Sequence, residues 1–200
     1  VTRNVTLPIG ISGDFVFIVR TDIYNQVFEA ALENNNIGLA RPTTVRLTPP
    51  PDLEMEVVNA PEVAKASDTL AISYRVANNG ATVTPNSSWT DAFYLSTDTQ
   101  LSPTTDILLG TRLHIGALDA GASYTASASF LLPATFSGTY YAFVVTDTKG
   151  EVFEAGVVAN NVRFDPAPVN VTLAPPDLEV TMVDAPSAGL ANHPISISYK

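Results

Sequence analysis

Three aspartates that lie close together are the residues of this sequence best suited to chemistry. Asp91 is followed by Asp98 and Asp106, and the last two flank the polar segment 99–105. Calcium takes six to eight oxygen ligands, and carboxylates in a polar loop can supply some of them. The segment is not an EF-hand loop, because Pro103 stands at the sixth position from Asp98, where glycine is needed. The three aspartates are therefore weak calcium candidates, with affinity expected near the millimolar range.

The same aspartates also have a purely structural interpretation. An Asp side chain can accept hydrogen bonds from nearby backbone N–H groups and so fix a turn. Asp98 and Asp106 would then cap turns between two strands, and no metal site would exist. Glu154, Asn160 and Asn161 have the same pair of interpretations, as turn residues or as a cation site near a domain junction.

Other chemistry has little support in the sequence. Cysteine is absent, so neither a disulfide nor a thiolate metal site can form. His114 and His193 are far apart, and a zinc site would need carboxylates to complete it. No Gly-x-Ser-x-Gly sequence and no glycine-rich phosphate loop occurs. The sequence therefore predicts no catalytic residue, no cofactor-binding residue and no enzymatic activity.

The composition indicates a folded, β-rich chain. Of 200 residues, 46% are hydrophobic and 15% are charged, which excludes an intrinsically disordered chain. A formal net charge of -10 makes nucleic acid an unfavourable partner, since phosphates repel it. No stretch approaches the roughly 18 apolar residues of a membrane span. Because Val1–Asn4 resembles neither a signal peptide nor a natural N-terminus, we expect targeting signals outside this segment.

Internal repetition organises the sequence. Seven short motifs occur twice, each time 125 residues apart. Only the stretch before the proline-rich junction departs from this spacing, by one residue. The pairs are Ser12-Gly13 with Ser137-Gly138, Thr21-Asp22 with Thr146-Asp147, Val27-Phe28-Glu29-Ala30 with Val152-Phe153-Glu154-Ala155, Asn35-Asn36 with Asn160-Asn161, Asp52-Leu53-Glu54 with Asp177-Leu178-Glu179, Ala60-Pro61 with Ala185-Pro186, and Ile72-Ser73-Tyr74 with Ile197-Ser198-Tyr199. Such a period is the size of a domain and too long for a solenoid unit.

Prolines mark the boundaries between the repeats. Pro49-Pro50-Pro51 and Pro175-Pro176 each precede an Asp-Leu-Glu sequence. Consecutive prolines restrict φ and favour an extended, stiff connector. We therefore expect residues 1–48 to be the C-terminal part of one repeat, 49–174 a complete repeat and 175–200 the N-terminal part of the next. The first partners of each repeat would be its neighbours in the same chain.

Alternation of apolar and polar residues predicts seven strands in the complete repeat. They cover residues 53–57, 70–77, 89–95, 107–115 with a bend at Gly110, 123–132, 140–145 and part of 162–173. No segment of this size has a sustained helical period. The pattern predicts all-β architecture, as tandem seven-stranded β-sandwiches of the immunoglobulin or fibronectin type III kind. Trp89 is expected in the core, and a carbohydrate-stacking surface position is its alternative.

An ordered set of motifs runs through the complete repeat. It comprises Pro51-Asp52-Leu53-Glu54, Ala60-Pro61, the sequence from Ile72 to Gly80, Trp89-Thr90-Asp91, the sequence from Tyr94 to Asp98, the sequence from Asp106 to Gly110, Phe153-Glu154 and Asn160-Asn161. This set resembles the CARDB domain, named as a cell-adhesion-related domain in bacteria. The resemblance extends to both partial repeats. It implies tandem β-sandwiches in a secreted or cell-surface protein and carries over no catalytic or ligand-binding residue.

These observations favour a non-catalytic extracellular module. It would act as a stalk, spacer or adhesion scaffold in a large bacterial secreted or surface protein. Two alternatives stay open. The module could bind a carbohydrate or protein ligand on a cell surface or matrix, or it could be an accessory region of a secreted hydrolase.

Overall fold

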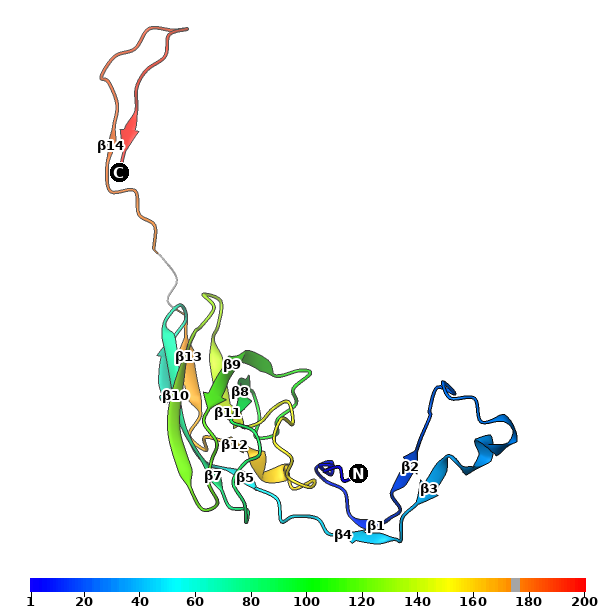
Figure 1. Cartoon of the computed structure of the whole chain (residues 1–200). Coiled ribbons are helices and arrows are strands. Elements are labelled where there is room, and N and C mark those ends of the chain that lie inside the picture. Colours follow the sequence, from blue (N-terminus) through cyan, green and yellow to red (C-terminus); the bar gives the residue numbers. More distant parts are fainter. Residues whose placement is uncertain (174–176) are drawn as a thin grey trace.

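A β-sandwich occupies the middle of the chain. The computed structural model describes residues 1–173 and 177–200, without the side chains of residues 31–33. The predicted connector Pro175-Pro176, and with it the expected boundary between residues 174 and 175, lies outside the described residues. Residues 53–172 form two sheets (Figure 1). Both sheets contribute buried side chains to one hydrophobic core.

The smaller sheet has three antiparallel strands. Its order is β10 (Ser123–Leu131), β7 (Thr69–Asn78) and β5 (Leu53–Asn59). Side chains alternate between the faces of a strand, and the sequence of β7 follows this period. Its inward residues are Leu70, Ile72, Tyr74 and Val76, each at most 1% exposed. The predicted alternation of this segment is confirmed.

The larger sheet contains the remaining six strands of the sandwich. They are β6 (Val63–Lys65), β13 (Val169–Thr172), β11 (Gly138–Val145), β8 (Ser88–Ser96), β9 (Ile107–Ile115) and β12 (Val162–Phe164). The first five follow one another in this order, and β12 pairs with β11. Strand β6 runs parallel to β13, whereas the other pairs are antiparallel.

Strand β8 is buried on both of its faces. Trp89 and Phe93 point into the main core between the sheets. Tyr94 belongs to a second, smaller cluster on the other face, where Phe143 and Phe164 pack against it. A strand covered on both faces reads as a continuous apolar run rather than as an alternation, which explains the apolar segment from Ala92 to Leu95.

The predicted strands agree with the structure in six of seven cases. Strands β5, β7, β8, β9, β10 and β11 lie within two residues of the expected bounds. The bend at Gly110 is confirmed as a bulge, because the pairing steps from Phe93–Gly110 to Tyr94–Leu108. The last segment holds two strands, β12 and β13, since Pro166 and Pro168 lack the N–H groups that a ladder needs. Strand β6 was not predicted.

The flanking segments form short paired strands and one 3-10 helix. The strand pairs are β1 (Gly13–Phe15) with β4 (Thr43–Val45), β2 (Ile18–Arg20) with β3 (Ile37–Leu39), and β14 (Val183–Asp184) with β15 (Ser198–Tyr199). The helix is η1 (Ala30–Asn35). They extend away from the sandwich at two places (Figure 1). All residues from 177 to 200 are exposed, so the core of this structure is that of the sandwich alone.

Candidate functional site

Asp91 is the centre of a buried polar network. It lies in β8 and is 0% exposed. Its Oδ2 accepts hydrogen bonds from Tyr74 Oη at 2.6 Å and Tyr124 Oη at 3.1 Å. Its Oδ1 accepts one from Thr146 Oγ1 at 2.8 Å and a longer one from the Asp147 N–H at 3.4 Å. Because protein donors engage both oxygens, the carboxylate acts as an anchor that joins the two sheets.

The two tyrosines are held as hydrogen-bond donors. Burial, followed by the charge of Asp91, raises the pKa of both Tyr74 and Tyr124 well above the usual value of 10.0. Arg112 Nη1 donates a further hydrogen bond to Tyr74 Oη at 3.2 Å. Both tyrosines therefore keep their hydroxyl protons at neutral pH and donate them to Asp91.

Trp89 belongs to the same region of the core. It is 0% exposed, so its predicted core position is confirmed. Its Nε1 donates to Thr146 Oγ1 at 3.2 Å, and its ring stacks on His114 with 3.8 Å between ring centroids. The alternative of a carbohydrate-stacking Trp89 is wrong, because two sheets cover the ring. Every residue from 53 to 172 is described, and no aromatic side chain among them is exposed.

Asp98 and Asp106 lie in the loop between β8 and β9. Asp98 Oδ1 accepts the Gln100 N–H at 2.8 Å, and Asp106 Oδ2 accepts the Ser102 N–H at 2.7 Å. These are the bonds of the turn-capping interpretation. The structure does not gather the three predicted calcium candidates, since Asp91 is enclosed by its own donors. Among the side chains that the structure describes, no group of three His, Cys, Asp or Glu residues could hold a metal ion.

Glu154 and the following asparagines close the sandwich near the start of β5. Glu154 is 2% exposed. It accepts hydrogen bonds from the Leu53 N–H and, at 2.6 Å, from Asn161 Nδ2. Asn160 Nδ2 donates to Asp52 Oδ1 at 2.9 Å. Burial raises the pKa of Glu154 above the usual 4.5. These contacts connect the loop before β12 to the start of β5, the first strand of the sandwich.

Asp147 organises the loop that leads to Glu154. It has a φ of 46°, in the left-handed region. Its two carboxylate oxygens accept the N–H groups of Glu151 at 2.7 Å and Val152 at 2.9 Å. Burial raises its pKa above the usual 3.8. The recurring Thr-Asp motif is therefore a structural device, in which Thr146 supports Asp91 and Asp147 shapes the loop.

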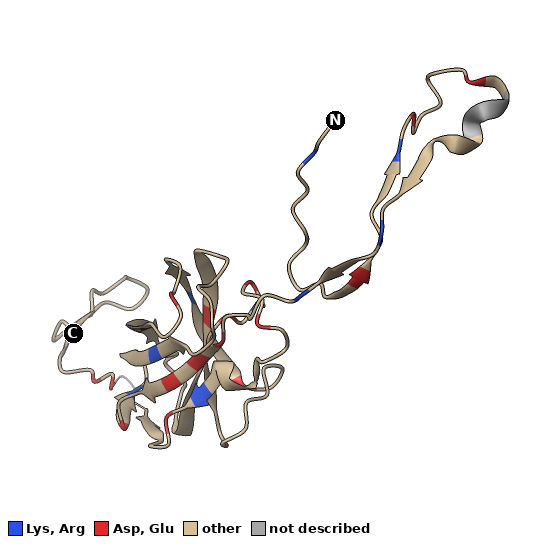
Figure 2. Cartoon of the chain, turned by 60° about the horizontal axis from the view of Figure 1, so that its bottom comes forward, with Lys and Arg blue, Asp and Glu red and all other residues tan. Residues whose placement is uncertain are grey.

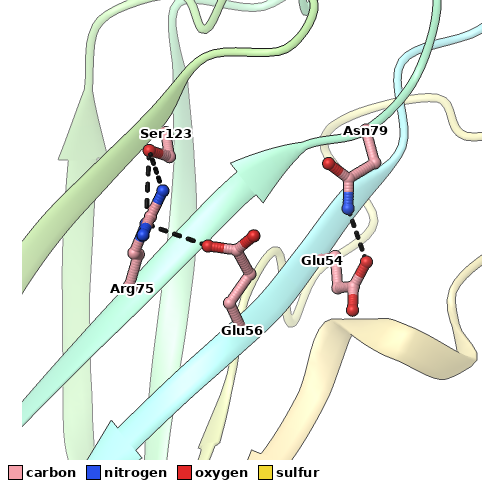
Figure 3. Close-up of polar contacts among 5 residues, drawn as sticks. All are labelled: Glu54, Glu56, Arg75, Asn79 and Ser123. Atoms are coloured by element: carbon pink, nitrogen blue, oxygen red, sulfur yellow. Dashed lines mark hydrogen bonds and ion pairs between the residues drawn. The ribbon is translucent and has the colours of Figure 1, made fainter.

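The outward face of the smaller sheet carries exposed polar contacts (Figure 3). Arg75 Nε lies 2.9 Å from Glu56 Oε2, and its guanidinium also donates to Ser123 Oγ. Asn79 donates to Glu54. An exposed ion pair of this kind contributes at most about 1 kcal/mol. Figure 2 shows the acidic positions spread over the sandwich and the flanking segments, so the net charge is not concentrated at this face.

Sequence reasoning missed the partners of Asp91. Tyr74, Tyr124 and Thr146 come from three different strands or strand ends, and no local spacing relates them. The available signal was an Asp within an apolar strand, which has to find donors when it is buried. His114 and His193 do not meet either. His114 stacks on Trp89, whereas His193 lies in the exposed segment 177–200.

The fold and these contacts define the class of the protein, an all-β sandwich module whose buried carboxylates hold strands and loops together. No helix in the described part of the chain is long and apolar enough to cross a membrane. The model of the CARDB family matches residues 50–164, more than half of the chain. The chain therefore belongs to the CARDB family, as the motifs indicated.

Several solved structures are similar to this chain at low sequence identity. The CARDB domain of a Pyrococcus furiosus protein, solved in complex with di-metal ions, is 20% identical, with 62% of this chain and 90% of that chain covered and a TM-score of 0.45. Its solution structure is 22% identical, with coverage of 62% and 97% and a TM-score of 0.44. A β-glucosidase from Listeria innocua in complex with glucose is 15% identical, covered over 62% and 16%, with a TM-score of 0.38. A comparison with curated proteins gave no match.

Proposed function

We propose that this chain is a non-catalytic extracellular repeat module that acts as a stalk, spacer or adhesion scaffold in a larger bacterial secreted or surface protein. The family is linked to adhesion-like roles. Asp91, Asp147 and Glu154 are buried in the sandwich, and both oxygens of each carboxylate accept hydrogen bonds from the backbone or from core side chains. Groups engaged in this way support a scaffold role.

The observation that carries the proposal is a recurrence of local structure at the sequence period. Asp22 accepts the N–H groups of Gln26 at 2.6 Å and Val27 at 3.0 Å, in the same way as Asp147, which lies 125 residues later. Asp22 also shares the left-handed conformation, with a φ of 41°. A short local motif that recurs with its backbone conformation supports a tandem arrangement.

Strand pairings recur as well. The register of β2 with β3 matches that of β11 with β12, and the register of β14 with β15 matches part of that of β5 with β7. The matching pairs are Ile18–Leu39 with Phe143–Phe164, Arg20–Ile37 with Val145–Val162, Val183–Tyr199 with Val58–Tyr74, and Asp184–Ser198 with Asn59–Ser73. They support the division into a partial, a complete and a second partial sandwich. In the larger sheet the edge strand β6 runs parallel to β13, and the smaller sheet has three antiparallel strands. This arrangement of two sheets favours a sandwich of the immunoglobulin or fibronectin type III kind.

The stalk function is tested by adding a repeat. A chain with a second copy of residues 50–174 inserted after residue 174 should be longer by about one sandwich in small-angle X-ray scattering. The extended chain should unfold at the same temperature, because each repeat is expected to be a domain with its own core, so a further repeat adds length without changing the stability of the others. A compact particle, in which the two copies fold against each other, would contradict the spacer role.

A second candidate is a protein-binding module, favoured by one observation. Strand β9 is the edge of the larger sheet, and Leu108, Leu113 and Ile115 on it are 54%, 55% and 79% exposed. An exposed, apolar edge strand can accept an added strand from a partner. Saturable binding of an extended peptide that is lost in Leu113→Lys, with unchanged stability, would favour this candidate over the spacer.

A further inference from the structure

The ring of Phe153 lies against the chain that precedes the sandwich. A Cβ atom placed on Gly10 would lie 2.7 Å from Cζ and 2.8 Å from Cε2 of this ring, so only glycine leaves room for the contact. Gly10 has a φ of +81°, which side chains rarely adopt. The residue thus combines a tight turn with a close approach, at a distance of more than 140 positions in the sequence.

The proline connector is fastened to the sandwich at the same place. The carbonyl oxygens of Pro49 and Pro50 accept hydrogen bonds from Thr82 Oγ1 at 3.0 Å and from the Ala81 N–H at 3.2 Å. The Asn79 N–H donates to the Asp52 carbonyl oxygen at 2.7 Å. A Cβ atom on Gly80 would lie 2.5 Å from the Pro50 oxygen, so the connector also crosses the turn in close contact.

Apolar side chains surround the Gly10–Phe153 contact on both sides of the connector. They form a shallow apolar cleft, lined among others by Leu7, Ile9, Val45, Leu47, Val83 and Pro85. The first four precede the connector and the last two belong to the sandwich. Leu7, Ile9 and Leu47 remain 41%, 63% and 38% exposed, so only part of this apolar surface is removed from water. The part that is covered favours keeping the two sides of the cleft together.

We propose that this junction is a fixed joint between consecutive repeats. The turn of residues 78–82 holds the connector, and Phe153 docks on the turn around Gly10, so the preceding repeat keeps one orientation relative to the sandwich. The proposal rests on the proposed function only in taking residues 1–48 as part of a neighbouring repeat. The surface formed by Phe153 and the turn of residues 78–82 is therefore occupied by the preceding repeat of the same chain.

The geometry of the complete repeat agrees with a head-to-tail joint. At a spacing of 125 residues, the segment 7–11 corresponds to 132–136. That loop lies at the end where the chain leaves the sandwich, because Leu132 O accepts the Ser67 N–H at 3.1 Å beside the strand that ends at Thr172. Phe153 precedes Glu154, which accepts the N–H of Leu53 at the start of β5. The start of β5 lies at the opposite end of the sandwich from the place where the chain leaves it (Figure 1). Thr135 stands where Gly10 stands, so the ring-on-glycine contact is specific to this junction.

Solution NMR of the 200-residue chain tests the joint. We expect nuclear Overhauser effects between the Phe153 ring protons and residues 9–11, and Gly10 Hα resonances shifted by the ring current. Phe153→Ala should abolish the Gly10 shift. Gly10→Ala should abolish the Overhauser effects, since its Cβ would collide with the ring. The indole N–H resonance of the buried Trp89 should stay in place in both variants, which shows that the sandwich is intact.

Gly13→Ala is the matched control. Gly13 also has a left-handed φ, of +120°, but no atom lies within 4 Å of the Cβ position. This variant should therefore keep the Phe153 contacts. The joint would be refuted by unshifted Gly10 resonances in the unmodified chain, by a shift that survives Phe153→Ala, or by equal losses in Gly10→Ala and Gly13→Ala. None of these results bears on whether the repeats form a stalk, which the insertion experiment decides separately.

Discussion

At the scale of single residues, the sandwich depends on three buried carboxylates whose oxygens all accept hydrogen bonds. Asp91, Asp147 and Glu154 are each at most 6% exposed, yet no lysine or arginine forms an ion pair with them in the described part of the chain. Backbone N–H groups and neutral side chains stabilise these carboxylates instead. Removing one partner of such a network leaves the others unpaired and costs more than the mean value of a hydrogen bond.

Replacement of Asp91 by alanine should expose this dependence. Tyr74 Oη, Tyr124 Oη and Thr146 Oγ1 would all lose their acceptor. We expect a loss of more than about 3 kcal/mol in the free energy of unfolding, at 1–3 kcal/mol for each unsatisfied group. Urea unfolding measures it. Asp98→Ala, which removes a single exposed cap, should cost no more than about 1 kcal/mol, and equal losses would contradict the anchor role.

Trp89→Ala should be comparably severe for a different reason. The indole fills the core between the sheets, so truncation removes buried apolar surface and leaves a cavity. The expected cost is about 3–5 kcal/mol, measured as a shift of the urea midpoint at constant slope. A loss below about 1 kcal/mol would mean that the core closes over the gap, contrary to the packing described.

His114 should make the stability depend on pH. Burial lowers its pKa below the usual 6.5, with Asp91 and Arg112 acting in opposite directions. The folded state therefore binds this proton less readily than the unfolded state, so stability is full above pH 6.5 and is lost as the pH falls through the folded value. Asp147 and Glu154, whose pKa values are raised, have the opposite sign.

The comparison of variants isolates the histidine. In chemical unfolding at several pH values, His114→Gln should lose part of the decline in stability below pH 6.5. His193→Gln, which lies outside the sandwich, should leave the profile unchanged. An identical profile in the unmodified chain and His114→Gln would show that the buried imidazole does not contribute.

At the scale of elements, the bulge in β9 is where the larger sheet adapts to the core. The Phe130 ring of β10 packs beside Phe93 with 5.0 Å between centroids, and a Cβ atom on Gly110 would lie 2.8 Å from Phe130 Cε1. Glycine in a strand often marks such a close approach. The two sheets thus meet where the Phe130 ring of β10 packs against the backbone of Gly110 in β9.

Gly110→Ala should overpack this edge. We expect a loss of about 1–3 kcal/mol in the free energy of unfolding. The double variant with Phe130→Leu should lose less than the sum of the two single variants, because the smaller side chain makes room for the added methyl group. Thermal or urea unfolding of the four proteins gives the coupling, and strict additivity would contradict a direct collision.

At the scale of the whole molecule, the sandwich carries the stability. The buried hydrophobic side chains all lie between residues 53 and 171 in the part of the chain that the structure describes. Residues 1–48 and 177–200 instead expose large apolar side chains, such as Phe28 at 90% and Leu178 at 94%. In a longer tandem array these side chains would be covered by the rest of their own sandwiches.

Residues 49–174 should therefore fold alone. Circular dichroism should show a cooperative thermal transition within about 4 °C of that of the full chain, the shift that corresponds to less than about 1 kcal/mol for a domain of this size. The isolated segment 1–48 should give an unfolded spectrum. An unfolded spectrum for 49–174 would show that the repeat is not the cooperative unit.

The sequence by itself determined the period, the positions of six strands and the family. These depend on local signals: alternation in β7 and β10, prolines that end strands, and motifs that recur at a constant spacing. The position of Trp89 in the core also followed, because a large apolar side chain within a strand is stabilised by burial. The bend was also predicted correctly, because Gly110 is the one glycine in β9 and a glycine inside a strand often marks a bulge.

Only the tertiary structure decided what the acidic residues do. Asp91 and Asp98 are close in sequence and looked alike, yet one is enclosed by donors from both sheets and the other caps an exposed turn. The contact of Gly10 with Phe153 was equally invisible. A carboxylate's role depends on which donors reach it, and those donors come from strands that the sequence separates by tens of residues and the sandwich brings together.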